Sequence, residues 1–231
     1  MKVLYLLVNL FTIIIPFLFS FHPKIQFHKT WKEFFTASVL VGVVFVIWDS
    51  VFTSMGVWNF NPQYLLGVYL FGLPLEELLF FICIPFSCVF TYFCLDKFFN
   101  LAWNRQAENI FCILFAVALI GVGTYFHDRI YTLVTMYSTA IVCLYLQFGA
   151  RVDWLGKAAF VYTILLIPFF IVNGVLTGSG IDEAVVRYNP AHHIGFRILT
   201  VPVEDAVYGF ELILLNLYFY KLFQARFFNR K

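Results

Sequence analysis

The chain has 231 residues, of which 62% are hydrophobic, 21% aromatic and 12% charged. Its mean hydropathy of +0.86 is far above that of an ordinary soluble domain, so the composition predicts an integral membrane protein. The net charge of +2 provides no broad basic face, which excludes nucleic acid as an expected partner. The lipid bilayer is the expected environment.

The cysteines give no sign of a disulfide framework or a metal site. There are five, an odd number, and they lie in apolar runs without a C-x-x-C pair, so we interpret them as small packing residues. His192 and His193 are adjacent and cannot bind one metal ion from a single helical face. No metal site is therefore expected.

Seven apolar stretches reach the length of about 17 to 25 residues with which a helix crosses a bilayer. In chain order they cover residues 3–20, 34–53, 64–95, 109–126, 130–150, 158–177 and 198–223. The first could instead be a signal peptide, but no A-x-A-like cleavage site follows Ser20 and the stretch has a repeat partner. The predicted fold is therefore all-α, with seven transmembrane helices.

One unusual pattern occurs twice. Asn61-Pro62, Gly67 and Pro74-Leu75-Glu76-Glu77 recur 128 positions later, with the same spacing, as Asn189-Pro190, Gly195 and Pro202-Val203-Glu204-Asp205. Both carboxylate pairs border an apolar stretch, where an ionised side chain costs roughly 2.5 to 3.5 kcal/mol at mid-helix. The sequence therefore predicts an active site with two halves, and its catalytic candidates are Glu76, Glu77, Glu204 and Asp205.

The same offset of 128 places the first three stretches on the fifth, sixth and seventh, and leaves the fourth as a linker. Equivalent helices then run in the same direction, so two parallel three-helix repeats are expected rather than inverted ones. The predicted divisions are residues 1–100 for the first repeat, 101–128 for the linker helix and 129–231 for the second repeat. Both motifs should enter from one side, with the third and seventh helices adjacent or facing each other across one aromatic-lined cavity.

Lysine and arginine predict the orientation, because cytoplasmic loops carry an excess of them. Eleven lie on one side, and the other side has Lys2, Arg129, Arg187 and Arg197. The expected location is a bacterial inner membrane, with the C-terminus in the cytoplasm and the N-terminus outside. Both motifs then lie near the outer face, where the connections around 54–63 and 178–197 should cap the site.

A capped helix start is the ordinary interpretation of one Pro-x-Glu motif, since proline pre-sets φ at the first helical position and carboxylates complement the helix dipole. Two matching copies favour a functional site instead. Neighbouring residues on a helix diverge by about 100°, so only one carboxylate of each pair can face a cavity. Because Glu204, Tyr208 and Glu211 form a polar stripe, the sequence predicts that Glu204 faces the interior rather than Asp205.

Further polar residues within or beside the spans are candidates for substrate binding: Asp49, Asn61, Asn173, Asn189, Arg197, Tyr208 and Glu211. Asp49 could equally have a structural hydrogen-bonding role. Asn61 and Asn189 precede proline and are typical turn formers. Arg187 and Arg197 could pair with a carboxylate of the second motif or extend to the lipid headgroups, and the sequence leaves both possibilities open.

The doubled Pro-x-Glu-[Glu/Asp], the Tyr188-Asn189-Pro190 stretch and the seven spans resemble the small membrane-bound lycopene cyclases of the bacterial heterodimeric type and their fused forms. The cyclase half of the bifunctional fungal carotenoid enzymes is similar. The resemblance covers nearly the whole chain, most specifically residues 48–81 and 173–215. It implies a fused two-repeat lycopene β-cyclase with a UbiA-like helical bundle, in which the family's acidic pairs correspond to Glu76, Glu77, Glu204 and Asp205.

The reaction that this resemblance implies is a redox-neutral isomerisation of the end groups of lycopene or a related linear carotenoid. An acid protonates the terminal double bond, a second double bond attacks the tertiary cation, and loss of a proton leaves the β-ring. A carboxyl group buried among apolar side chains can stay neutral and donate that proton, while aromatic rings stabilise the cation. Glu204 is the expected donor, and Glu76 the expected base or cation stabiliser.

No cofactor is expected, because the reaction moves no net electrons and no G-x-G-x-x-G fingerprint follows a strand. Other classes fit less well. A prenyltransferase of the same architecture should carry D-x-x-x-D or D-D-x-x-D motifs, which are absent from the sequence, and a retinal protein needs a mid-helix lysine where Lys221 lies at a helix end. The alternative is a non-catalytic carotenoid-binding or transport membrane protein.

Overall fold

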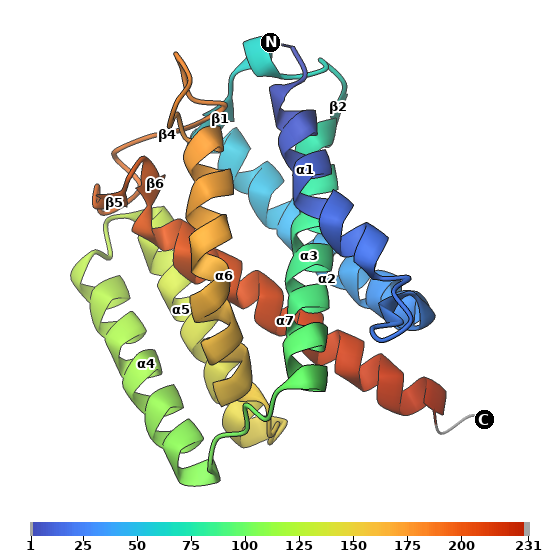
Figure 1. Cartoon of the computed structure of the whole chain (residues 1–231). Coiled ribbons are helices and arrows are strands. Elements are labelled where there is room, and N and C mark those ends of the chain that lie inside the picture. Colours follow the sequence, from blue (N-terminus) through green and yellow to red (C-terminus); the bar gives the residue numbers. More distant parts are fainter. Residues whose placement is uncertain (1, 229–231) are drawn as a thin grey trace.

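Residues 2–228 are described by the structure, a computed structural model, and they form seven α-helices with short strands at one end (Figure 1). The helices are α1 (Leu4–Phe19), α2 (Trp31–Ser54), α3 (Leu75–Phe98), α4 (Arg105–Tyr125), α5 (Ile130–Leu144), α6 (Leu155–Leu176) and α7 (Val203–Phe228). The strands are β1 (Trp58–Phe60), β2 (Tyr69–Leu70), β3 (Leu73–Pro74), β4 (Val186–Tyr188), β5 (Arg197–Ile198) and β6 (Val201–Pro202). A π-helical segment, Tyr145–Gly149, continues α5.

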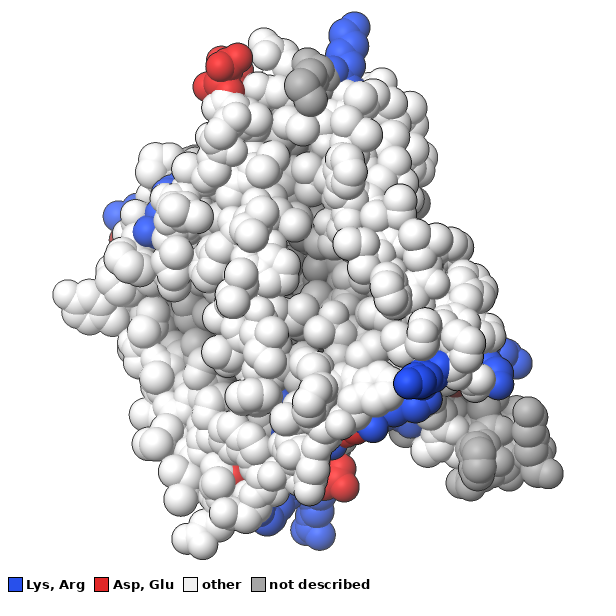
Figure 2. All heavy atoms as spheres, in the orientation of Figure 1, with Lys and Arg blue, Asp and Glu red and all other residues white. Residues whose placement is uncertain are grey.

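Six of the described helices are long and apolar enough to cross a membrane. The exception is α1, whose 16 residues extend about 24 Å at 1.5 Å per residue, less than the hydrocarbon core of about 30 Å. The face in Figure 2 carries its charged side chains toward its two ends, with an uncharged band between them. The prediction of a membrane protein is confirmed, while a crossing by α1 stays a prediction.

The helices of the third and seventh apolar stretches begin later than the sequence predicts. The expected starts were residues 64 and 198, whereas α3 begins at Leu75 and α7 at Val203. The residues in between form the β2–β3 hairpin, and in the second repeat the β5–β6 hairpin. Phe71 and Leu199 in their turns have φ of 55° and 56°, values that an α-helix cannot contain. Each helix therefore starts only after its hairpin.

The two repeats meet through a strand pair. β1 and β4 are antiparallel with Asn59 opposite Arg187, and these two residues are themselves 128 positions apart. Beside them Asn61 N–H donates to Val185 O and Asn189 N–H to Val57 O, both at 2.8 Å. Reciprocal pairing of this kind is produced by a two-fold axis through the pair. A pseudo-two-fold axis therefore relates the two repeats at this strand pair, and their parallel arrangement in the membrane stays a prediction.

Helix packing brings both motifs to one end of the bundle, which we call the motif end. Figure 1 shows α3 and α7 starting near the end where the N-terminus lies and running toward the end that holds the C-terminus. α1 packs on α3, α2 packs mainly on α7, and α3 and α7 are in contact. The predicted adjacency of the third and seventh helices is confirmed.

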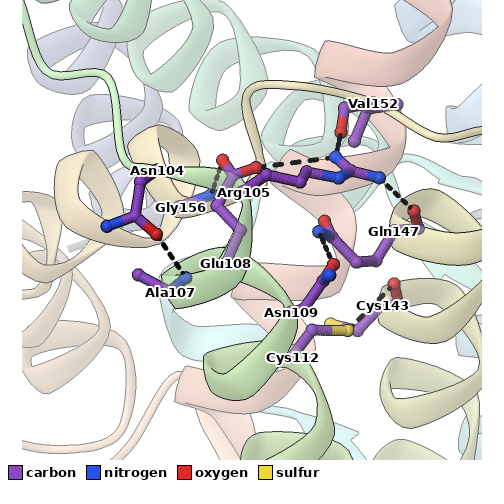
Figure 3. Close-up of polar contacts among 10 residues, drawn as sticks. All are labelled: Asn104, Arg105, Ala107, Glu108, Asn109, Cys112, Cys143, Gln147, Val152 and Gly156. Atoms are coloured by element: carbon purple, nitrogen blue, oxygen red, sulfur yellow. Dashed lines mark hydrogen bonds and ion pairs between the residues drawn. The ribbon is translucent and has the colours of Figure 1, made fainter.

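The linker helix α4 is anchored at the opposite end by a buried carboxylate (Figure 3). Glu108 accepts a hydrogen bond of 3.0 Å from Gly156 N–H in the first turn of α6 and lies 3.6 Å from the Arg105 guanidinium. Arg105 also donates to the carbonyl of Gln147 at 2.7 Å and to that of Val152. Glu108 thus connects α4 with α6, and Arg105 connects α4 with the π-helical end of α5.

We expect Glu108→Ala to lower the free energy of unfolding by about 1 to 3 kcal/mol, because the buried Gly156 N–H loses its acceptor. Glu108→Gln retains an acceptor oxygen and should lose less. A titration with denaturing detergent measures both, with Asp128→Ala, which removes an exposed ion pair with Arg129, as the control of small effect. Equal losses for the Ala and Gln variants would contradict the assigned hydrogen bond.

Candidate functional site

A cavity of about 520 Å³ lies within the bundle, lined by α1, α2, α3, the start of α5, α6, α7 and the strands β1 and β4. Its volume is in the range of small-molecule sites, roughly 300 to 1,000 Å³. Most of the lining is aliphatic or aromatic, and its acidic side chains are Asp49, Glu77 and Asp205. The cavity therefore combines an apolar wall with three carboxyl groups from three helices.

The cavity opens sideways, toward the region where lipid would lie. Phe11 and Ile15 of α1 and Ile171 of α6 line it, although they are 73%, 63% and 65% exposed on the outer surface. The surface in Figure 2 is recessed between α1 and α6, where α3 lies behind them. An apolar molecule could enter through this opening without crossing water.

The second carboxylate of each motif points into the cavity and is held by tyrosines. Tyr5 of α1 donates to Glu77 at 2.6 Å. Tyr131 of α5 and Tyr188 of β4 donate to the two oxygens of Asp205 at 2.6 and 2.8 Å. Hydrogen bonds donated to a carboxylate stabilise its ionised form.

The first carboxylate of each motif turns away from the cavity to the segment that precedes its helix. Glu76 accepts from Leu66 N–H at 2.6 Å, and Glu204 accepts from Ile194 N–H at 2.8 Å, which is the same contact 128 positions later. Thr132 of α5 adds a hydrogen bond of 2.6 Å to Glu204. Both glutamates are fully buried, so they fasten the covering segments to the helix starts.

The prediction that Glu204 rather than Asp205 faces the cavity is wrong. On α7 the lining face includes Asp205, Tyr208 and Leu212, at i, i+3 and i+7. Glu204 lies on the adjacent face, where it accepts the N–H of the half-buried Ile194. Both residues are interior, as the polar stripe indicates, but the stripe does not reveal which neighbour each one meets.

Of the seven candidates for substrate binding, three line the cavity: Asp49, Asn173 and Tyr208. The other four lie outside its lining: Asn61, Asn189, Arg197 and Glu211. The two asparagines accept from the backbone N–H two residues later, at 3.1 and 3.0 Å, as turn formers do. Glu211 accepts hydrogen bonds from Ser138 and Thr139 of α5 at 2.7 and 2.9 Å. Direct contact between these four and a molecule in the cavity is not supported.

Of the two possibilities left open for Arg187 and Arg197, the ion pair with Glu204 or Asp205 is not formed among the described residues. Arg187 pairs with Glu183 at 2.5 Å on the surface. Arg197 donates to Thr200 O at 2.5 Å, and its guanidinium lies 5.7 Å from the centre of the Tyr188 ring. Both side chains are thus used within the segments that cover the motif end.

Sequence reasoning missed the tyrosines that hold the inward carboxylates. Tyr5 and Tyr131 both begin the first helix of their repeat, but they are 126 positions apart rather than 128, so a search at the motif offset passes over them. The sequence analysis used Tyr188 only as part of the Tyr188-Asn189-Pro190 stretch, and the equivalent position of the first repeat, 128 residues earlier, is Phe60. Burial and the neighbouring Asp205 carboxylate raise the pKa of Tyr188 well above its ordinary value, so its hydroxyl stays protonated and donates.

Trp58 was also missed as a cavity residue. It lines the cavity from β1, with its ring 5.2 Å from that of Tyr131 and 5.9 Å from that of Tyr188. Within the described residues, no group of three or more His, Cys, Asp or Glu is placed to hold a metal ion. The arrangement places carboxyl groups that can donate or accept a proton beside the aromatic rings of the cavity.

Comparison with known protein families gives a match over both repeats. A family model described as lycopene cyclase matches residues 2–95 and again residues 128–223. No curated protein and no solved structure matches the chain. The two matched segments are the two repeats, and α4 lies between them.

We expect Tyr131→Phe to cost about 1 to 3 kcal/mol of unfolding free energy, because Asp205 loses one of two donors in a buried site. The matched control on the same helix is Tyr137→Phe, which removes an exposed hydroxyl bonded to Thr124 at 2.8 Å. Its cost should be below about 1 kcal/mol. Unfolding titrations in detergent compare the two, and a larger loss for the control would refute the assigned role of Tyr131.

Proposed function

The chain belongs to the lycopene cyclase family, and from that premise we propose that it converts end groups of lycopene, or of a related linear carotenoid, into β-rings. The reaction is an isomerisation initiated by an acid and needs neither an oxidant nor a reductant. The observation that carries the proposal is the convergence of Asp49, Glu77 and Asp205 on one apolar, aromatic cavity.

The position of the cavity suits a hydrocarbon substrate. Its opening between α1 and α6 is lined by Phe11, Ile15 and Ile171, so an end group can enter from the lipid while the rest of the polyene stays in the opening. Removal of the reacting end from water protects a carbocation from capture. One end group therefore reacts at a time.

Asp205 is the proposed base that removes the final proton. Two tyrosines donate to its carboxylate, which favours the ionised form that can accept a proton. Glu77 receives one such hydrogen bond, from Tyr5, and is the proposed electrostatic stabiliser of the cation. Both lie on the first turn of a helix, and both line the cavity.

Aromatic rings supply the remaining stabilisation of the cation. Tyr208 lines the cavity and packs edge to face against Trp48 and Phe45, with centroid distances of 5.2 and 5.0 Å. Trp58 lines it from β1. A desolvated cation over such a face gains about 2 kcal/mol or more.

Glu76 and Glu204, expected from the sequence to be catalytic, are proposed instead to position the catalytic carboxylates. Their hydrogen bonds to Leu66 N–H and Ile194 N–H support this, because they fix the segments that cover the cavity. The glutamine variants keep an acceptor oxygen for these N–H groups. The effect of removing the charge should therefore be smaller than at the cavity residues.

The placement in the membrane is also a proposal. Seven crossings, a UbiA-like bundle and the divisions at residues 1–100, 101–128 and 129–231 remain predictions. Among the described residues, lysine and arginine gather at the end opposite the motif end, as the lower part of Figure 2 illustrates. The positive-inside rule then places this end in the cytoplasm and the N-terminus outside. Arg230 and Lys231, which contribute to the count, lie outside the described residues.

Expression in lycopene-accumulating cells tests the function. Wild-type protein should convert the red pigment to cyclised carotene, and Asp205→Asn should reduce the rate roughly 10²- to 10⁴-fold, as the loss of a general base does. Glu204→Gln should lower the rate by less than about tenfold, because the amide oxygen still accepts the hydrogen bonds from Thr132 and Ile194 N–H. Pigment extraction and chromatography measure the three strains at matched protein levels.

Persistently red wild-type cells that contain folded protein would favour the non-catalytic carotenoid-binding or transport alternative. Equal losses in Asp205→Asn and Glu204→Gln would instead reject the division between cavity and positioning carboxylates. These two outcomes separate a failure of the function from a failure of the residue assignment.

A second prediction concerns cofactors. Purified protein in liposomes, treated with chelator and freed of nucleotides and flavin, should convert lycopene at its untreated rate, because proton gain and loss balance without electron transfer. Chromatography of the product before and after treatment is the measurement. A strict requirement for added Mg²⁺ or reduced flavin would overturn the cofactor-free reaction.

A further inference from the structure

Asp49 is the cavity carboxyl that the motifs do not include. It lies on α2, is 3% exposed and lines the cavity with Glu77 and Asp205. Its Oδ2 atom is buried and has no hydrogen-bond partner among residues 2–228. Such a buried polar atom is costly unless the group is neutral or meets a ligand.

The three cavity carboxyls differ in the donors around them. Glu77 receives the Tyr5 hydroxyl, and Asp205 receives those of Tyr131 and Tyr188. For Asp49, no hydroxyl donor is found among the described residues. The Trp58 indole N–H lies near enough to favour the ionised form of Asp49, but its geometry does not make a hydrogen bond, and its nitrogen has no partner among the described residues. The ionised form is thus stabilised at the first two sites and least at Asp49.

Neighbouring charges act in the same direction. The titratable groups that line the cavity with Asp49 are Glu77, Asp205, Tyr5, Tyr131, Tyr162, Tyr188, Tyr208 and Cys88, none of them a cation. Two ionised carboxylates in one apolar cavity repel each other. Of these two carboxyls, Asp49 is the one whose surroundings favour the protonated form, because the Tyr5 hydroxyl stabilises the charge on Glu77.

The second repeat has no counterpart of this acid. The position 128 residues after Asp49 is Thr177, whose hydroxyl donates to Asn173 O at 2.8 Å and contacts that of Thr200 at 2.7 Å. The repeats share a framework but carry different groups at this position. Asp49 therefore makes the two halves of the site chemically different.

We propose that Asp49 is the acid that initiates cyclisation, with the first repeat supplying the proton and the second repeat, through Asp205, removing one. This inference rests on the proposed function. The O–H bond of Asp49 breaks as a C–H bond forms at the terminal double bond, which leaves a tertiary cation. The second double bond then forms the ring C–C bond, and Asp205 takes a proton from the adjacent carbon. Return of that proton to Asp49 restores the enzyme, so protons and electrons balance.

The test compares Asp49→Asn, Asp49→Glu and the neighbouring control Ser50→Ala in liposomes containing lycopene. Asp49→Asn should lose roughly 10² to 10⁴ in rate, and Asp49→Glu should recover part of that loss, because it restores an acid of different length. Ser50 bonds to Phe71 O at 2.6 Å and lies outside the cavity lining, so its variant should convert lycopene at nearly the wild-type rate.

Infrared difference spectroscopy gives a readout that does not depend on turnover. The resting wild-type protein should show the C=O stretch of a protonated carboxyl that is absent from Asp49→Asn and shifted in frequency in Asp49→Glu. An unchanged band in both variants, or an Asp49→Asn rate within threefold of wild type, would overturn the proposal. Inactive wild-type protein would count against the proposed function itself, whereas the infrared result would still locate the proton.

Discussion

The burial of two carboxylate pairs at the starts of two apolar helices is the constraint on which the rest of the structure depends. A carboxylate removed from water needs donors, and each pair obtains them from two directions. Glu76 and Glu204 use backbone N–H groups of the segments before their helices. Glu77 and Asp205 use tyrosine hydroxyls from α1, α5 and β4. The hydrogen bonds to these four acids therefore fix the hairpins, the covering strands and the first helix of each repeat together.

The pseudo-two-fold framework allows two similar halves to build one site rather than two. The β1–β4 pair, with Asn59 opposite Arg187, closes the motif end and carries Trp58 and Tyr188 over the cavity. Around this axis the halves have diverged in chemistry, since Asp49 corresponds to Thr177 and Phe60 corresponds to Tyr188. A proton donor and a proton acceptor need different surroundings, and a single cavity shared by two unlike halves provides them.

Much of the candidate site could be predicted from the sequence because it depends on spacing. The 128-residue offset identifies both motifs, and the β1–β4 pair, which joins the segments before them, shows that they lie at the same end of the bundle. The helix starts could not be predicted, because the positive φ of Phe71 and Leu199 depends on the hairpin turns rather than on hydropathy. Nor could Tyr131 be found, since its contact with Asp205 spans 74 positions.

By itself the sequence determined the membrane class, the two-repeat organisation and the identity of the four motif acids, because these follow from composition and from distances along one chain. Only the tertiary structure decided which acid of each pair faces the cavity. Glu204 and Asp205 are neighbours about 100° apart on a helix, and the choice between them depends on where Ile194 N–H and the Tyr131 hydroxyl lie. Those groups reach the carboxylates through folding of distant segments, so three-dimensional packing assigns their places.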